Sequence, residues 1–259
     1  MMTIITLTTD FGTTDGYVGA MKGVILGLAP NATLVDISHD VHPQDVRHGA
    51  RILATAVPFF PPGAIHVAVV DPGVGSARRG IALRTSCATF VGPDNGLFTS
   101  FLPERLACVA LTNPVTHRRP VSVTFHGRDI FAPVAAHLAN GLPLAELGPA
   151  VDDPVSWLNP QPQRLPDGWL RAEVVYVDRF GNLVTNVGPV EWESMDLRDL
   201  RIVVGAVSLA VRRTYADVEK GTLLALAGSD GYLEIAVREG SAAEQLGLGV
   251  GATLTVWGM

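Results

Sequence analysis

The residues best suited to hydrolytic chemistry follow a short apolar run, residues 66–70, in the first third of the chain. The run is too short for a helix and is bounded by turn-forming residues, so it predicts a buried β-strand. It ends at Asp71-Pro72-Gly73, where Pro and Gly favour a turn. Open α/β sheets bind ligands at the carboxyl ends of such strands, which makes Asp71 a candidate site residue.

Two further side chains form a candidate catalytic set with Asp71. Arg78 follows seven residues later, so a short loop can fold its guanidinium back onto the Asp71 carboxylate. His126 stands before a glycine, and an imidazole changes protonation near neutral pH. Each residue also has a structural alternative, because an Asp–Arg pair can tie down a loop and a histidine can bond a nearby backbone carbonyl.

Other polar residues gather where predicted strands end. Those in the first half of the chain are Asp10, Asp15, His39, His42, Asp94 and Asn95. A second cluster, Asp178-Arg179-Phe180-Gly181-Asn182, fits a hairpin turn as well as a binding site. We expect no phosphate cradle, because neither a Walker A sequence nor GxGxxG follows a strand.

A metal site is the alternative for the histidines near residue 40. His39, His42, Asp45 and His48 stand at steps of three, a spacing compatible with metal ligands. Pro43 interrupts the run, however, and histidines at the start of a helix are commonly solvated or act as caps. We therefore predict no metal.

The composition of the chain argues against several classes of protein. The chain has 259 residues, 47% of them hydrophobic, and a net charge of −6, which argues against nucleic-acid binding. Cys87 and Cys108 lack CxxC spacing and are expected to be reduced. The sequence shows no apolar run of membrane-spanning length and no signal-peptide pattern at its start. These features predict a cytoplasmic protein without membrane segments.

The order of predicted elements divides the chain into two domains. Alternating strands and helices over residues 1–148 predict a layered α/β domain. Its strands are expected at 4–8, 33–37, 66–70, 80–84, 89–91 and 106–111, and its helices at 15–28, 45–57 and 131–140. Five prolines mark a linker at 149–169. Short strands separated by glycine-containing turns over residues 170–259 predict a smaller all-β barrel.

Five motifs in one order carry a resemblance to a known family. They are Thr9-Asp10-Phe11-Gly12, Val70-Asp71-Pro72-Gly73-Val74-Gly75, Gly92-Pro93-Asp94-Asn95-Gly96, Phe125-His126-Gly127-Arg128-Asp129-Ile130-Phe131-Ala132-Pro133 and Asp178-Arg179-Phe180-Gly181-Asn182. Together they resemble the S-adenosyl-L-methionine (SAM) hydroxide adenosyltransferases, or SAM hydrolases, relatives of the fluorinases and chlorinases. The resemblance covers nearly the whole chain.

The resemblance implies hydrolysis of SAM to adenosine and L-methionine by a homotrimer, without a cofactor, with the ligand between domains of neighbouring subunits. It implies a catalytic set of Asp71, Arg78 and His126. It matches Asp10 to a ribose-binding carboxylate, and Asp15 and Asp178 to acidic residues near the methionine amino group. The remaining substrate-binding candidates are Phe11, Gln44, Asp94, Asn95, Phe180, Asn182 and Ser229.

Departures from the halogenating relatives also bear on function. Their central-loop Tyr and Thr correspond to Asp71 and Val74, and a carboxylate there should repel a halide and favour water. Their ribose-side aromatic corresponds to Gln44, and their carboxylate-binding Arg to Asp230. Backbone amides near Ser229 are the candidates for holding the methionine carboxylate instead.

The expected reaction is the placing of a water in line with the ribose 5′ carbon, an orientation problem. Asp71 is assigned to bind and polarise that water, with His126 as the hypothetical proton acceptor. Two alternatives stay open: a SAM- or adenosine-binding protein without turnover, and a metal-dependent phosphohydrolase using Asp10, His39, Asp71 and His126.

Overall fold

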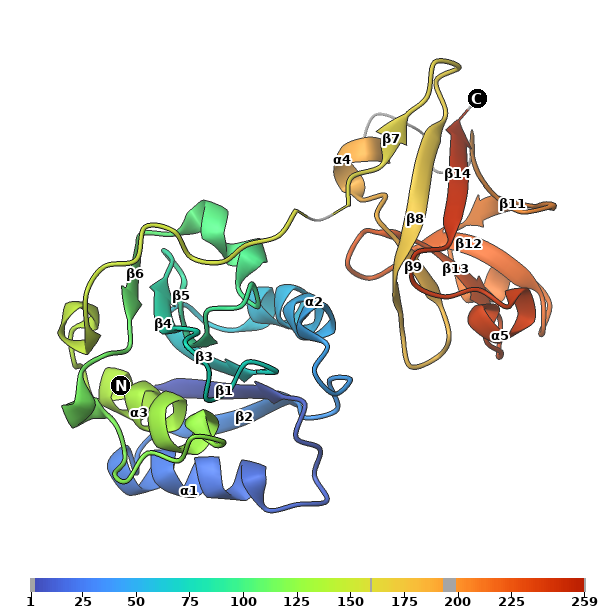
Figure 1. Ribbon diagram of the computed structural model, residues 1–259. Coiled ribbons are helices and arrows are strands. Elements are labelled where there is room, and N and C mark those ends of the chain that lie inside the picture. The colour runs from blue at the N-terminus through green and yellow to red at the C-terminus, as the bar shows by residue number, and fades with distance from the viewer. Residues whose placement is uncertain (1–2, 159, 193–198, 259) are drawn as a thin grey trace. The chain divides into compact units, whose positions relative to one another are not determined.

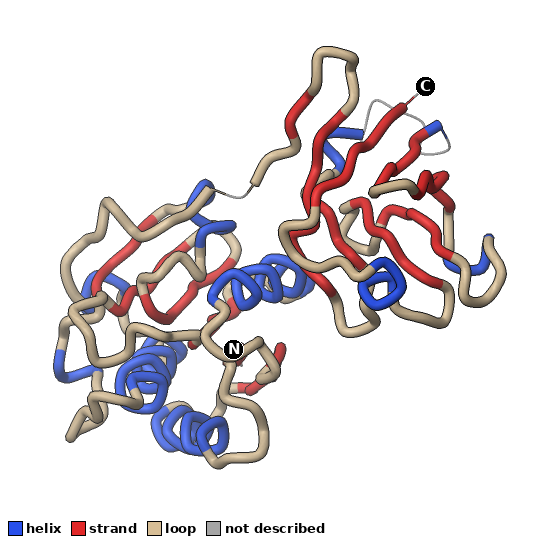
Figure 2. The backbone as a smooth tube through the Cα atoms, turned by 45° about the vertical axis from the view of Figure 1, so that its right-hand side comes forward, coloured by secondary structure: helices blue, strands red, loops and turns tan. Residues whose placement is uncertain are grey.

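A computed structural model of the chain describes residues 3–158, 160–192 and 199–258. The chain divides into two compact units, residues 1–157 and residues 158–259, each with its own core (Figure 1). Helices cover a sheet in the first unit, whereas strands dominate the second (Figure 2). The predicted combination of an α/β domain and a β-barrel is confirmed.

A six-stranded mixed sheet forms the centre of the first unit, in the order β2-β1-β3-β5-β4-β6. Its strands are β1 (Ile4–Thr9), β2 (Thr33–Ser38), β3 (Ala64–Val69), β4 (Gly80–Arg84), β5 (Ala88–Pro93) and β6 (Ala107–Ala110). The strands β2, β1, β3 and β5 are parallel, so their carboxyl ends meet at one edge of the sheet. Asp10, Asp71 and Asp94 all follow this edge.

Helices on both faces bury the sheet, which explains the continuous apolar run of β3. Val67 and Val69 belong to the core beneath α1 (Tyr17–Leu28) and α3 (Ala132–Ala139), which lie side by side (Figure 1). Ala68 and Val70 point to the opposite face, which α2 (Val46–Ala56) covers. Short turns of helix complete the unit: η1 (Val57–Phe59), η2 (Thr99–Glu104), η3 (Pro114–Thr116), the π-helical η4 (Gly127–Phe131) and η5 (Leu144–Leu147).

The helix starts show one difference from expectation. Asp45 caps α2 as expected for a residue of its type, and its carboxylate accepts a hydrogen bond from the His48 amide at 2.9 Å. The helix α1 begins two residues later than the predicted range 15–28, and its N-cap residue is Gly16. The Asp15 carboxylate is one residue too early to accept from the first helical amides, which leaves it on an exposed loop.

The direction of β4 positions the two arginines that precede it. β4 lies between β5 and β6 and runs antiparallel to both. Its amino end therefore lies at the edge where the parallel strands have their carboxyl ends. This brings Arg78 and Arg79 back to the aspartates that follow β3 and β5.

The second unit is a closed barrel of seven strands with one extra strand at its side. The barrel strands are β8 (Leu170–Val177), β9 (Leu183–Thr185), β10 (Leu200–Val204), β11 (Val207–Arg212), β12 (Leu223–Ala227), β13 (Leu233–Val237) and β14 (Thr253–Gly258). Antiparallel pairing of β14 with β8 closes the barrel, and the two-residue β7 (Gln163–Arg164) pairs with β8 from outside. The unit also contains α4 (Pro189–Trp192), η7 (Tyr215–Asp217) and α5 (Ala242–Leu246).

Within the described ranges, every helix is too short or too polar to be a candidate for crossing a bilayer.

Candidate active site

Asp71, Arg78 and His126 are in direct contact at the carboxyl edge of the sheet. Arg78 binds both oxygens of the Asp71 carboxylate: its Nε donates to Oδ1 at 2.9 Å, and its Nη2 donates to Oδ2. The same Nη2 lies 2.9 Å from Nδ1 of His126. The guanidinium also lies over the Phe131 ring, 5.3 Å from the centroid. The structure thus joins the three residues that the sequence suggested as a catalytic set.

The contact with Arg78 decides which nitrogen of His126 carries the proton. A guanidinium has only N–H donors, so Nδ1 of His126 must accept, and the neutral ring carries its hydrogen on Nε2. Burial, together with the positive charge of Arg78, lowers the pKa of His126 below its ordinary value, although Asp71 and Asp129 act in the opposite direction. At neutral pH His126 is therefore a hydrogen-bond donor through Nε2.

Asp10 and Gln44 also meet at this edge. The Gln44 amide donates to Oδ2 of Asp10 at 2.8 Å, and Gln44 has a left-handed backbone with a φ of 67°. Non-glycine residues adopt that conformation only when the surroundings hold it there. The Asp10 carboxylate therefore helps to hold the loop that carries Gln44.

Three aromatic rings lie beside these residues. Phe11 and Phe125 are in edge contact, with centroids 5.9 Å apart, and Tyr17 contacts both. Phe125 precedes His126 in the chain, so this cluster connects the Asp10 loop to the candidate catalytic set. Of these rings, the sequence identified Phe11 as a candidate. Tyr17 and Phe125 give no signal that separates them from ordinary core residues.

Asp94 and Asn95 have protein partners for their side chains. Asp94 is buried; its Oδ2 pairs with Arg79 at 2.7 Å, and its Oδ1 accepts from the Val155 amide at 2.7 Å. Asn95 donates through Nδ2 to the Val70 carbonyl at 2.8 Å. These contacts tie the end of β5 to the start of β4 and to the segment that follows β3.

The candidates in the second unit form a turn of their own. Oδ1 of Asp178 accepts from the amides of Phe180 and Asn182, and Oδ2 accepts from Nδ2 of Asn182 at 2.8 Å. This is the hairpin arrangement considered above. The Phe180 ring is 76% exposed at the tip of the turn, and Ser229 is also exposed.

Two acidic side chains are buried and hydrogen-bonded, and the sequence did not predict their burial. Asp129 is fully buried beside His126, and Glu234 is buried in the barrel, where the Tyr215 hydroxyl donates to its Oε1 at 2.5 Å. Burial and the carboxylate of Glu234 raise the pKa of Tyr215. A buried acid next to an arginine or inside a strand is recognisable only after its partners are known.

The histidines considered for a metal have protein partners. Nδ1 of His39 lies 2.8 Å from the Thr9 hydroxyl, and Nδ1 of His48 accepts from the His42 amide at 3.0 Å. Burial, followed by the influence of His42, lowers the pKa of His48. Among the described residues, no group of three or more His, Cys, Asp or Glu side chains is arranged to hold a metal ion.

Comparison with known proteins identifies the family. The model of the SAM hydroxide adenosyltransferase N-terminal domain matches residues 5–148, and that of the C-terminal domain matches residues 172–255. The chain is 46% identical to an (R)-S-adenosyl-L-methionine hydrolase of Salinispora arenicola, over 97% of each chain. It is 44% identical to a protein of the same name from Thermus thermophilus, covering 92% of this chain and 93% of that one.

More distant relatives also match along nearly the whole chain. A fluorinase of an Actinoplanes species is 31% identical, over 98% of this chain and 97% of its own. The crystal structure of an uncharacterized conserved protein from Thermotoga maritima superposes with a TM-score of 0.90 at 37% identity, covering 97% of this chain and 99% of that one. Since both family models and full-length relatives match, the chain belongs to the SAM hydroxide adenosyltransferase family.

Proposed function

We propose that this protein hydrolyses S-adenosyl-L-methionine to adenosine and L-methionine, and that it acts on the (R) form named in its relatives. The observation that carries the proposal is the contact of Asp71 and His126 with the same nitrogen of Arg78. It presents a carboxylate and an imidazole donor side by side at the ligand-binding edge of an α/β sheet. Two polar groups so arranged can orient one water molecule.

Hydrolysis of SAM depends more on the orientation of the attacking water than on acid catalysis. A water oxygen forms the bond to the ribose 5′ carbon, the bond from that carbon to sulfur breaks, and its electron pair leaves on the sulfur of methionine. Because the sulfonium becomes a neutral thioether, the leaving group needs no proton. The water must approach in line and lose one proton, which passes to solvent from the side of the polarising Asp71 carboxylate. A fixed, partly desolvated pair of hydrogen-bonding groups favours this arrangement.

The roles of the three residues follow from their hydrogen bonds. Both oxygens of Asp71 are held by Arg78 and keep lone pairs free to accept from water. We assign Asp71 to bind and polarise the water. Nε2–H of His126 is a donor, so it serves to orient the water oxygen. For His126 to accept the proton at Nδ1, it would first have to give up its bond with Arg78.

The substrate-binding candidates are proposed to act as the resemblance implies. Asp10 binds the ribose hydroxyls, Asp15 and Asp178 bind the methionine amino group, and Asn182 binds the adenine edge. The side chains of Phe11, Gln44, Phe180 and Ser229 line the remaining site. The protein partners of Asp94 and Asn95 favour a part in holding the site rather than in touching the substrate.

We further propose a cytoplasmic homotrimer that needs no cofactor. The candidates divide between the two units, with Asp10, Asp71 and His126 in the first and Asp178 and Asn182 in the second. This division supports a site that is completed by a neighbouring subunit. Light scattering of the purified protein measures the assembly directly.

The test is to incubate chelator-treated protein separately with the (R) and (S) forms of SAM and to follow adenosine and methionine by chromatography. We expect equal release of both products from the (R) form and a loss of about 10²-fold or more in Asp71→Asn. Asp36→Asn serves as control, because Asp36 lies on β2 and its carboxylate pairs with Lys22 of α1. Saturable binding without product release would refute hydrolysis and leave a binding protein, and activity only with added metal would favour the phosphohydrolase.

A further inference from the structure

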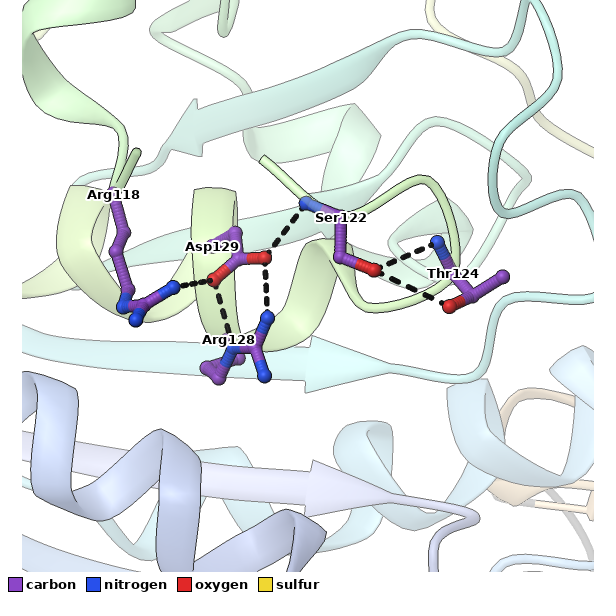
Figure 3. A network of polar contacts seen from close by, with 5 residues as sticks. All are labelled: Arg118, Ser122, Thr124, Arg128 and Asp129. Carbon is purple, nitrogen blue, oxygen red and sulfur yellow. Dashed lines mark hydrogen bonds and ion pairs between the residues drawn. The ribbon is translucent and has the colours of Figure 1, made fainter. Parts of the chain in front are cut away.

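A buried, charged network lies next to His126. The Asp129 side chain is fully buried, and its carboxylate accepts from four donors. Oδ1 accepts from Nε of Arg128 at 2.7 Å and from Nη1 of Arg118 at 3.2 Å, and Oδ2 accepts from Nη2 of Arg128 and the Ser122 amide at 2.7 and 2.8 Å (Figure 3). Burial alone would raise the pKa of Asp129, but these hydrogen bonds lower it, so the group stays ionised.

The donors reach Asp129 from both sides of His126. Arg118 and Ser122 precede His126 in the chain, and Arg128 follows it. The backbone closes the same loop, because the Arg118 amide donates to the Asp129 carbonyl at 2.9 Å and the Asp129 amide donates to the Phe125 carbonyl at 3.1 Å. His126 thus lies within a ring of bonds centred on one carboxylate.

The segment that carries His126 has little freedom on its other sides. The guanidinium of Arg128 lies over the Phe125 ring, 4.8 Å from the centroid. A Cβ atom on Gly127 would lie 3.2 Å from Sδ of Met21, so α1 packs closely against the start of η4. Single π-helical turns such as η4 are frequent at functional sites.

The same loop supports the residues that face His126. The Val123 carbonyl lies against Gly75, in the loop between Asp71 and Arg78. A shift of residues 118–125 would therefore move His126 and disturb the support of Arg78 together. The 2.9 Å contact between Nη2 of Arg78 and Nδ1 of His126 depends on both.

We propose that Asp129 is a positioning residue that holds Nδ1 of His126 against Arg78 and so keeps the imidazole in its Nε2–H form. The expected effect on catalysis rests on the proposed hydrolysis of SAM, whereas the expected effect on the protonation of the His126 imidazole does not. In Asp129→Asn, one acceptor oxygen becomes an N–H₂ group that faces the donors of Arg128 or Ser122. The ring of bonds around His126 then loosens.

The experiment compares Asp129→Asn, Asp129→Glu and the control Asp36→Asn with the parent protein. A misplacement on the order of 1 Å can reduce a rate about 100-fold, so we expect kcat of Asp129→Asn to fall about 10- to 100-fold while KM changes less than about threefold. Asp129→Glu keeps the charge and should lie between this variant and the parent. Asp36→Asn should retain the parent kcat.

The ring itself gives a second readout that needs no turnover. With ¹⁵N-labelled histidine, the parent protein should show an unprotonated Nδ1 and a protonated Nε2 for His126, and Asp129→Asn should show averaging of the two forms. Folded Asp129→Asn with the parent kcat and an unchanged His126 signal would overturn the proposal. If the parent protein releases no adenosine, the proposed hydrolysis is refuted. A changed His126 signal in Asp129→Asn would then still support the positioning role.

A second variant keeps the test decisive if Asp129→Asn does not fold. Arg118→Gln removes only the 3.2 Å hydrogen bond, and the Arg118 side chain is 46% exposed. It should lower kcat by about threefold or more and shift the His126 signal in the same direction, given the sensitivity of rates to orientation. Parent values for both readouts in Arg118→Gln would count against the proposal.

Discussion

A single methyl group at Gly75 should separate the two loops that form the candidate active site. Gly75 has a left-handed backbone with a φ of 78°, and a Cβ atom built on it would lie 2.5 Å from the Val123 carbonyl oxygen. Real Cβ atoms essentially never approach a heavy atom within 3.0 Å. In Gly75→Ala, either the loop carrying Asp71 and Arg78 or the segment 118–125 must therefore move, so that the two lie further apart.

The expected magnitudes have two parts. The left-handed conformation of an alanine costs about 1–2 kcal/mol in free energy of unfolding. Relief of the contact requires a shift of at least about 0.5 Å, and a misplacement on the order of 1 Å can reduce a rate about 100-fold. We expect kcat of Gly75→Ala to fall about 10-fold or more, because the shift acts on the bond between Arg78 and His126.

Gly63→Ala is the matched control. Gly63 has a φ of 89°, and no heavy atom lies within 4 Å of a Cβ atom built on it. It therefore has the conformational penalty without the steric one. Adenosine release measures kcat, and urea unfolding followed by circular dichroism measures stability. Gly63→Ala should lose about 1–2 kcal/mol in free energy of unfolding, Gly75→Ala should lose at least as much, and only Gly75→Ala should lose activity. Equal kcat values in the two variants would refute the coupling of the loops.

Two further predictions concern histidines. Burial and Arg78 lower the pKa of His126 below 6.5. Activity should therefore fall only as pH drops below 6.5, when Nδ1 takes a proton and loses its bond with Arg78. A pH–rate profile in which activity already falls above pH 6.5 would contradict this reasoning. Burial lowers the pKa of His66 to about 4, so its contribution to stability is complete above pH 6.5 and is lost as pH falls toward 4. The loss should be about 3 kcal/mol, measured by urea unfolding, and His66→Phe should lack this part of the pH dependence.

Local features of the sequence were sufficient for much of the fold. The strand β4 has its predicted bounds, 80–84, and β1 and β2 each extend one residue beyond their predicted ends at residues 8 and 37. The contact of Asp71 with Arg78 follows from a short loop at a strand end, so it too was accessible from spacing.

The partners of the buried acids were not accessible in the same way. Asp94 binds the Val155 amide, 61 residues further along the chain, and no local pattern signals such a contact. Asp129 stands next to Arg128 in the sequence, but its burial depends on a loop that begins at Arg118. The antiparallel insertion of β4 was similarly hidden, because an apolar run does not tell which neighbour it pairs with or in which direction.

The closure of the barrel has a consequence for the order in which the two units form during synthesis. β8 leaves the ribosome before any other barrel strand, yet one of its partners is β14, the last of them to be made. Until β14 arrives, the unpaired edges of β8 and β10 remain open to pairing with other chains. The first unit has no such dependence and can fold while the barrel is still being translated. The barrel is therefore the slower step, and nascent chains that stall before residue 253 should be the species that depend on chaperones.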